Sequence, residues 1–245
     1  GIGRGIALTL AQEGCDVMLT GRDEAALREV AAGVEKRGRR AKYQTLDLRE
    51  EKATSVLVAS VKESFGRLDI LVNNAGSFNF GPVHETTDEM LDEVLAISAR
   101  APFRLSREAL KHMGPGSSII FIGSTWGIYG TPGGGAYSFV KAGQIGLAQT
   151  MAAEYGAKGI RSNYIAPTVV RTEMTDAYWE LDFFKRTNFE LTPSDRQCTV
   201  DDVANTVAFL CSDEAGMING QTIAVDGGIS TTRYVAPEAV FAERK

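Results

Sequence analysis

The sequence has few cysteines and no long apolar runs. Its three cysteines, Cys15, Cys198 and Cys211, are odd in number, and their spacing matches no metal-binding or redox motif. We therefore interpret them as reduced thiols, expect no bound metal, and expect a cytoplasmic location. No apolar run approaches the ~20 residues of a membrane-spanning helix, so we expect no membrane partner.

The sequence also has no excess of basic residues. It has 26 Lys and Arg against 31 Asp and Glu, for a net charge of −5, and no basic cluster stands out, so nucleic acid is not an expected partner. Hydrophobic content of 44% and charged content of 23% are typical of a globular protein that can bury a sizeable core. Without repeats, low-complexity segments or a linker, residues 1–245 are predicted to form one domain.

Apolar runs typical of strands alternate with segments of helical periodicity. The strand-like runs are 16–20, 41–46, 69–72, 118–122, 160–165 and 222–225. The helical patterns lie near 3–14, 23–38, 50–65, 88–113, 136–157 and 201–212, and Thr87 and Thr199 resemble helix N-caps. Such alternation predicts an α/β fold, a parallel sheet with helices on both faces.

One tyrosine and one lysine are spaced for proton transfer. Tyr137 and Lys141 are four residues apart, so on a helix they lie on one face, one turn apart. A cation at ~4 Å in an effective dielectric of ~20 would favour the tyrosinate by roughly 4 kcal/mol. We therefore expect Tyr137 to act as a general acid and base near pH 7. Ser124, thirteen residues upstream of Tyr137, ends a predicted buried strand, where ligands bind in open α/β sheets.

The sequence contains four further motifs in order, and together with Ser124, Tyr137 and Lys141 they resemble the short-chain dehydrogenase/reductase family. The motifs are Asn73-Asn-Ala-Gly76, the Ser124–Tyr137–Lys141 set, the segment Ile160 to Pro167 followed by Thr172, and Gly220 to Gly228, with Gly1-Ile2-Gly3 opening the chain. The resemblance extends from Gly1 to about Ser230. It implies a Rossmann-like doubly wound sheet, an enzyme, and a homodimer or homotetramer.

The resemblance also implies the roles of the catalytic residues. Tyr137 would exchange a proton with the substrate oxygen, and Ser124 would hold that oxygen. Lys141 would lower the pKa of Tyr137 and hold the nicotinamide ribose. Trp126 would line the substrate site beside Ser124 and Tyr137.

A nicotinamide dinucleotide is the cofactor that the resemblance implies. Gly1, Ile2 and Gly3 would hold its pyrophosphate at a helix N-terminus. The adenosine would lie against Asp47 and Leu48 and against Asn73, Asn74, Ala75 and Gly76, and Pro167, Val169 and Thr172 would lie near the carboxamide. Gly21 occupies the position where an acidic residue would select NAD(H), and Arg22 follows it, so NADP(H) is favoured.

The sequence departs from the family pattern at three places. Ser98 stands where the family has an asparagine that holds a relay water, so Ser98 is a further candidate catalytic residue. Thr168 replaces a glycine, which would cost stability wherever φ is positive. Gly1 and Gly3 match the last two glycines of the family's pyrophosphate turn, so the first strand is expected to be missing from this chain.

A segment rich in aromatic residues, about 173–198, interrupts the alternation. Its rings are expected to close over the pocket, to pack on the body or a neighbouring subunit, or to do both. Together with Trp126 and Tyr129 they favour a ring-bearing or apolar substrate. The predicted activity is hydride transfer between NADP(H) and a carbonyl or secondary alcohol, of a 3-oxoacyl thioester or another ketone. The alternatives are a non-catalytic dinucleotide sensor and an inactive fragment.

Overall fold

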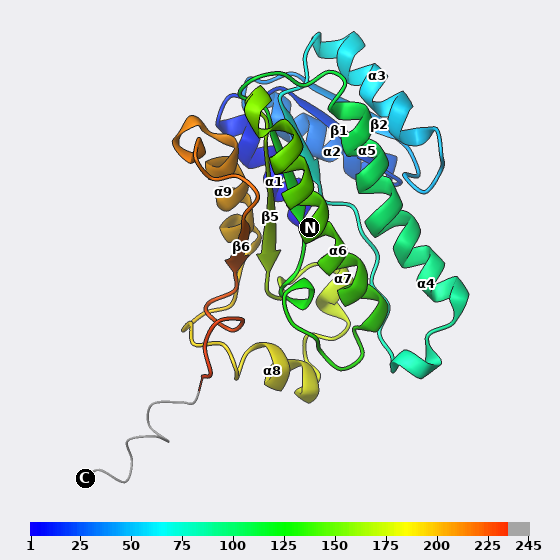
Figure 1. Cartoon of the computed structure of the whole chain (residues 1–245), viewed down its shortest axis with the longest axis vertical. Helices are drawn as coiled ribbons and strands as arrows, with labels where there is room; N and C mark the ends of the chain where they lie inside the picture. The colour runs from blue at the N-terminus through cyan, green and yellow to red at the C-terminus, as the bar shows by residue number, and fades with distance from the viewer. Residues whose placement is uncertain (235–245) are drawn as a thin grey trace, which may run out of the picture.

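Parallel strands form the centre of the structure, a computed structural model that describes residues 1–234 (Figure 1). The last residues of the predicted domain, 235–245, lie outside the described part. The strands are β1 (Val17–Gly21), β2 (Ala41–Thr45), β3 (Ile70–Asn73), β4 (Ser118–Ile122), β5 (Arg161–Pro167) and β6 (Thr222–Val225). Each matches a predicted strand to within about two residues.

The strands form two groups. β1 pairs only with β2, whereas β3, β4, β5 and β6 form a second sheet in that order, and all pairings are parallel. Within residues 1–234, no strand joins β1 to β3, so each keeps one edge without a partner. This division is the one expected for a doubly wound sheet that lacks its first strand.

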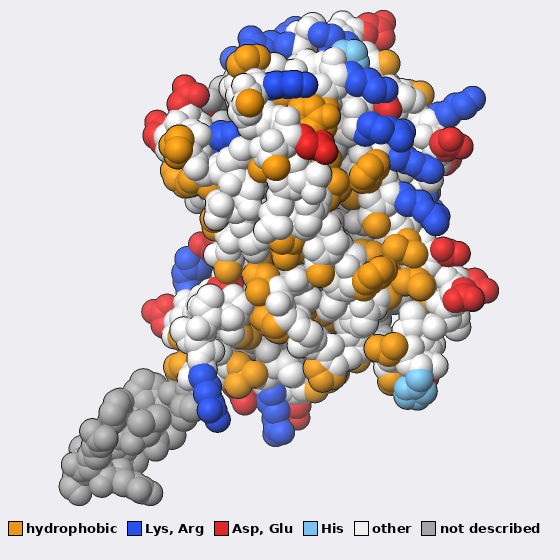
Figure 2. Space-filling view, viewed as in Figure 1, with side chains coloured by type: hydrophobic (Ala, Val, Ile, Leu, Met, Phe, Trp, Pro, Cys, Tyr) orange, Lys and Arg blue, Asp and Glu red, His pale blue; other side chains and the backbone are white. Residues whose placement is uncertain are grey.

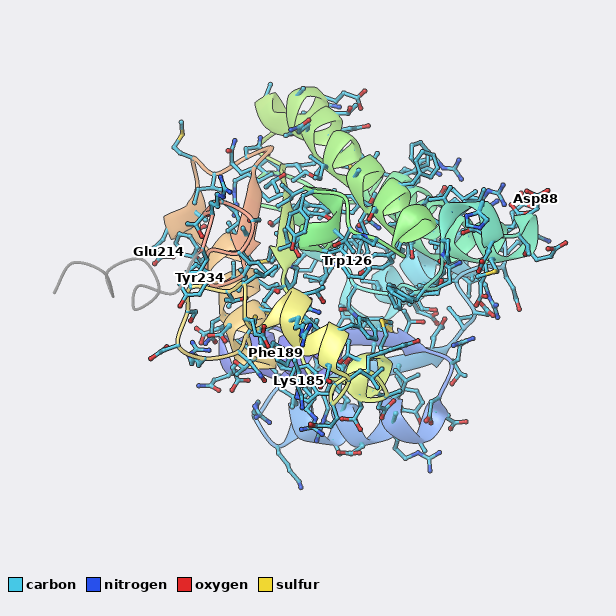
Figure 3. The ribbon with its side chains drawn as sticks, turned by 90° about the horizontal axis from the view of Figure 1, so that it is seen from below. Asp88, Trp126, Lys185, Phe189, Glu214 and Tyr234 are labelled. Carbon is cyan, nitrogen blue, oxygen red and sulfur yellow. The ribbon has the colours of Figure 1, made fainter. Side chains whose placement is uncertain are left out.

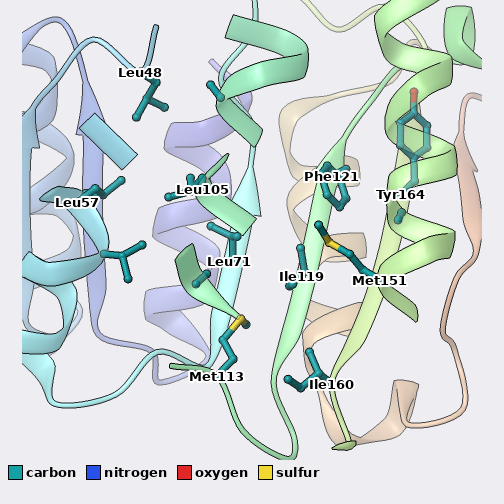
Figure 4. Close-up of a cluster of buried hydrophobic side chains, with 14 of the residues drawn as sticks. Leu48, Leu57, Leu71, Leu105, Met113, Ile119, Phe121, Met151, Ile160 and Tyr164 are labelled. Carbon is teal, nitrogen blue, oxygen red and sulfur yellow. The ribbon is translucent and has the colours of Figure 1, made fainter. Parts of the chain in front are cut away.

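Helices cover both faces of the sheets. They are α1 (Ile2–Gln12), α2 (Glu24–Glu35), α3 (Ala53–Phe65), α4 (Asp88–Leu95), α5 (Ala101–Ala109), α6 (Gly135–Tyr155), α7 (Glu173–Asp176), α8 (Asp182–Asn188) and α9 (Val200–Cys211). Along β4, Ile119 and Phe121 pack with α3, α5 and α6 (Figure 4), whereas Ile120 and Ile122 pack with α1 and α9. This alternation is the period of two of a strand buried on both faces.

The helix expected over 88–113 is interrupted. α4 ends at Leu95, and a π-helical turn, Ala96–Arg100, leads into α5. Such turns often occur at functional sites, and this one carries Ser98. The predicted caps are confirmed, since the Thr87 hydroxyl accepts from Met90 N–H and the Thr199 hydroxyl from Asp202 N–H.

The segment 173–198 holds the short helices α7 and α8, which lie below the carboxyl ends of the sheet strands in Figure 1. Seen from that side, Trp126 lies near the centre, close to the segment that carries Lys185 and Phe189 (Figure 3). The segment is therefore placed to cover the site. Among the described residues, no helix has both the length and the apolarity needed to cross a membrane.

Candidate active site

Ser124 begins the loop that follows β4. Its backbone is extended, with φ −163° and ψ 154°, and it caps a 3₁₀ turn, Thr125–Gly127. The Ser124 Oγ accepts a hydrogen bond from the Trp126 backbone N–H at 3.1 Å. The predicted serine therefore lies at the carboxyl end of a buried strand, as expected.

Tyr137 and Lys141 lie one turn apart at the start of α6. The Lys141 Nζ is 5.5 Å from the centroid of the Tyr137 ring and donates to the Ile122 carbonyl at 2.8 Å. Only 3% of Lys141 is exposed. Its amine thus ties α6 to the end of β4, the strand that leads to Ser124.

The pKa of Tyr137 differs from the sequence-based prediction. Burial raises the pKa of Tyr137 to about 12, although a hydrogen bond with Ser124 lowers it in part. Burial also lowers the pKa of Lys141 to about 8. The prediction that Lys141 brings the Tyr137 pKa near 7 was wrong for this structure, because the lysine is directed to the Ile122 carbonyl and burial disfavours both charges. The Ser124 side chain nevertheless lies near enough to the Tyr137 hydroxyl to lower its pKa.

Ser98 is fully buried. Its Oγ accepts from Ser77 N–H at 3.4 Å, and its carbonyl accepts from the Gln144 side-chain amide at 2.6 Å. A Cβ on Gly76 would come within 3.4 Å of the Ser98 Oγ and 3.8 Å of the Lys141 Nζ. The structure thus brings Ser98, Gly76 and Lys141 together, and it adds Gln144, which no sequence motif indicated.

Thr168 causes no backbone strain. No residue other than glycine has a positive φ within residues 1–234, and the Thr168 N–H donates to the Val225 carbonyl at 3.1 Å. The cost that a positive φ would carry therefore does not arise at Thr168, whose N–H pairs with β6.

The residues expected at the pyrophosphate and at the ribose lie at the N-terminus of α1 and directly after β3. Gly1 is the N-cap of α1, and Ile2 and Gly3 begin that helix. A Cβ on Gly3 would come within 2.7 Å of the Asn74 side chain, so α1 closely approaches the segment after β3. Asn74 and Ala75 are exposed there, whereas the side-chain amide of the preceding Asn73 donates to the Ser106 Oγ.

The expected adenosine residues follow β1 and β2. Arg22 is exposed directly after β1, and the neighbouring Asp23 caps α2 by accepting from Ala26 N–H at 3.1 Å. Asp47 is bound by the Arg49 guanidinium, which holds the pKa of its carboxyl at about 2, and the Arg22 charge contributes. Leu48 is 7% exposed and belongs to the core in Figure 4.

A nicotinamide dinucleotide fits this arrangement. The first N–H groups of α1 are free of side-chain caps and form the anion-binding end of a helix. Among residues 1–234, Lys141 donates one hydrogen bond, to the Ile122 carbonyl, so its other N–H groups could bind a ribose hydroxyl. No group of three or more potential metal ligands occurs within residues 1–234.

The residues expected near the carboxamide follow β5. Pro167 ends the strand and is buried, and Val169 lines a cavity of about 530 Å³ with Thr168, Cys198 and Asp226. Thr172 is the N-cap of α7, and its hydroxyl is paired with Thr175 in a capping box. This cavity does not include Ser124, Tyr137 or Lys141.

Aromatic rings surround the Tyr137 side chain. Phe78 lies 5.2 Å and Trp126 6.1 Å from the Tyr137 ring, between centroids. Tyr178 contacts Phe78 at 6.3 Å. The sequence-based interpretation included Trp126 and the segment that contains Tyr178 but missed Phe78, although its place two residues after Gly76 was an available signal.

A second pair of rings links the loop after β3 to α8. Phe80 and Phe183 stack at 5.7 Å, and each is 44% exposed. Figure 2 shows hydrophobic side chains gathered over the lower half of this face, between α4, α6 and α8. The exposed pair therefore forms a rim beside the tyrosine rather than part of the core.

The other rings of segment 173–198 pack on one another. Trp179 and Phe184 are less than a tenth exposed, and Phe189 lies 5.0 Å from Trp179 and 6.0 Å from Phe184. Tyr178 and Phe183 therefore reach the rings beside Tyr137, while these three rings form a cluster within the segment.

Known proteins resemble the chain along nearly its whole length. Residues 1–230 match the family model described as enoyl-(acyl carrier protein) reductase. The 3-oxoacyl-[acyl-carrier-protein] reductase FabG of Staphylococcus aureus is 37% identical over 237 residues, 94% of each chain. A tropinone reductase homologue of Arabidopsis thaliana is 33% identical and covers 100% of this chain and 81% of its own length.

Solved structures agree with these relatives. A short-chain dehydrogenase from Burkholderia cenocepacia in complex with NADP superposes with a TM-score of 0.89 at 35% identity, and 94% of each chain is covered. A gluconate 5-dehydrogenase from the same organism, in complex with NADP and tartrate, gives 0.88 at 26% identity, with 95% of this chain and 92% of the other covered.

Proposed function

The chain belongs to the short-chain dehydrogenase/reductase family of NAD(P)-dependent oxidoreductases that act on CH–OH or carbonyl groups, and on that premise we propose that it reduces an apolar, ring-bearing ketone with NADPH. The observation that carries this proposal is the arrangement of Ser124, Tyr137 and Lys141, with the rings of Phe78 and Trp126 beside Tyr137.

The chain's own residues would hold the cofactor from the pyrophosphate to the nicotinamide. The N-terminus of α1 would bind the pyrophosphate, and Arg22 would bind a 2′-phosphate. Asp47 follows β2 and Asn74 follows β3, at the carboxyl ends of the strands, where the adenosine would bind. Bound NADPH would supply the hydride that the carbonyl carbon accepts.

Tyr137 would supply the proton that the carbonyl oxygen needs. Burial keeps its phenol protonated, with a pKa of about 12, so at neutral pH it is ready to donate. The Ser124 Oγ would hold the oxygen by a hydrogen bond, which strengthens as negative charge develops there. A protonated Lys141 would stabilise the tyrosinate that remains after transfer.

The substrate class follows from the rings. A substrate oxygen bonded to Tyr137 would place its carbon skeleton against Phe78 and Trp126, which lie 5.5 Å apart, with Phe80 and Phe183 at the rim. Aromatic surfaces of this kind favour planar apolar groups. A flexible 3-oxoacyl thioester, the substrate class named for the FabG relatives, is the competing class.

The test is turnover of NADPH against a panel of ketones, with Tyr137→Phe as the decisive variant. Loss of the phenolic proton should lower kcat by roughly 10²–10⁴-fold while the dissociation constant for NADPH stays nearly unchanged. Tyr155→Phe, at the other end of the same helix, is the matched control and should keep its activity. Retention of more than about a third of kcat by Tyr137→Phe would exclude the tyrosine as the acid.

The panel also separates the substrate classes. Cyclic aryl ketones should have a higher kcat/KM than acyclic 3-oxoacyl thioesters, and Phe78→Leu should reduce kcat/KM for the cyclic ketones only. The opposite ranking would assign the chain to the 3-oxoacyl class and leave the Tyr137 result untouched.

A further inference from the structure

Tyr164 is a large polar side chain in the middle of β5, and it is fully buried. It pairs with Phe121 of β4 and packs with Phe121 and Met151 in the core cluster that lies under α6. In Figure 4 its ring rises from the strand and carries the hydroxyl away from Met151. Such a hydroxyl needs a partner, because an unpaired buried polar group is costly.

The partner is the main chain of Ser124, on both sides of the residue. The Tyr164 hydroxyl accepts from the Ser124 N–H at 2.9 Å and donates to the Ser124 carbonyl at 3.1 Å. One side chain therefore fixes both peptide groups that flank the serine. Because both peptide groups are held, the direction of the Ser124 Cα–Cβ bond is fixed. The position of the Cβ that carries the Oγ is therefore fixed as well.

Two glycines leave room for this ring. A Cβ on Gly123 would overlap the Tyr164 ring, and a Cβ on Gly127 would come within 2.5 Å of its hydroxyl oxygen. Gly123 precedes Ser124, and Gly127 ends the turn that Ser124 caps. Both sides of the serine are thus shaped to admit a tyrosine that comes from the neighbouring strand.

We propose that Tyr164 is a positioning residue, whose hydroxyl holds the Ser124 backbone so that the serine Oγ meets the substrate oxygen. The proposal rests on the role proposed above for Ser124. Tyr164 itself touches neither substrate nor cofactor. It acts on the reaction through Ser124 alone, and this restriction makes the proposal testable.

The first test removes only the hydroxyl. Tyr164→Phe keeps the ring and its packing, so the fold is retained, but it frees both peptide groups of Ser124. We expect kcat for the ketone to fall by roughly 10- to 100-fold, the cost of a small misplacement of a reacting group. The dissociation constant for NADPH should stay within about twofold, because no cofactor residue is altered. An unchanged kcat would overturn the proposal.

A control of similar structural cost separates positioning from general loosening. Val207→Ala removes buried volume from α9 on the opposite face of the sheet. It should lower the melting temperature at least as much as Tyr164→Phe and leave kcat unchanged. If Val207→Ala lowers kcat as strongly, the effect of Tyr164→Phe is general destabilisation and the proposal is wrong.

The deciding experiment is a double-mutant cycle with Ser124→Ala. Loss of the serine hydroxyl should itself lower kcat by about 10²-fold, and adding Tyr164→Phe should then cause no further loss. A further loss as large as in the wild-type background would show that Tyr164 acts by another route and would overturn the proposal. Full activity of Ser124→Ala alone would instead refute the proposed role of the serine, a result distinct from failure of the cycle.

Discussion

Replacing Lys141 with methionine should abolish turnover and yet stabilise the protein at neutral pH. Lys141 is 3% exposed, and burial lowers its pKa from 10.5 to about 8. That difference corresponds to roughly 3 kcal/mol of unfavourable free energy when the buried amine is charged. Methionine has a similar length and carries no charge, so this penalty disappears.

The lost hydrogen bond opposes the gain. Lys141 Nζ donates to the Ile122 carbonyl at 2.8 Å, and leaving that buried carbonyl without a donor costs about 1–3 kcal/mol. Lys141→Met should therefore be more stable than the wild type by about 1 kcal/mol at pH 7.

The pH dependence has a definite sign. Between the folded pKa of about 8 and the unfolded pKa of 10.5, the folded state binds fewer protons than the unfolded state. Wild-type stability therefore rises with pH across this window, and the penalty is fully present below it. By pH 10 most of the penalty is gone, so Lys141→Met should become the less stable protein by about 1 kcal/mol.

Urea unfolding at pH 7 and pH 10 measures both differences in stability. Other groups titrate equally in the two proteins. Any change with pH in the stability difference between Lys141→Met and the wild type therefore comes from Lys141. Lys158→Met, at an exposed lysine that lies over the Tyr155 ring, should show no such reversal. A stability difference between Lys141→Met and the wild type that is independent of pH would refute the reasoning.

Two further predictions concern the cofactor and the π turn. The double variant Gly21→Asp and Arg22→Ala should shift the ratio of the NADPH and NADH dissociation constants toward NADH by at least one charge-assisted bond, about 1.5–3 kcal/mol. A Cβ on Gly21 would make only ordinary contact with Leu27 at 3.5 Å, and Arg67→Ala, at an arginine paired with Asp69, is the control that should leave the ratio unchanged. Gln144→Leu removes the donor to the buried Ser98 carbonyl and should lower the free energy of unfolding by about 1–3 kcal/mol; equal urea midpoints for variant and wild type would contradict this.

The strands and helix caps could be predicted from the sequence because local patterns determine them. β4 is an apolar run in which Ile119 and Ile120 face opposite helix layers, and such a run predicts a strand buried on both faces. Thr87 and Thr199 cap helices through bonds that span only three residues. The split between β1 and β3 was expected because Gly1 and Gly3 match the last two glycines of the family's pyrophosphate turn, and the strand that precedes this turn in the family would lie between β1 and β3.

The features that the sequence did not reveal depend on contacts between distant segments. The Tyr164 hydroxyl reaches Ser124 across 40 residues, and Gln144 reaches Ser98 across 46. No local pattern encodes either bond. The pKa of Tyr137 was predicted wrongly for a related reason, since the i, i+4 spacing gives the distance to Lys141 but neither the burial of the pair nor the carbonyl that attracts the amine.

The glycines around the site show how these distant contacts are accommodated. Gly76 lies against Ser98 and Lys141, Gly123 against Tyr164, and Gly134 against the Trp126 ring. The Tyr164 and Trp126 rings thus occupy volume that a Cβ on Gly123 or Gly134 would fill, whereas a Cβ on Gly76 would make ordinary contact. The glycines therefore shape the site, because the absence of their side chains leaves room for the functional groups. Alanine at Gly123 or Gly134 should displace the facing ring, because a packed interior transmits even the volume of one methyl group.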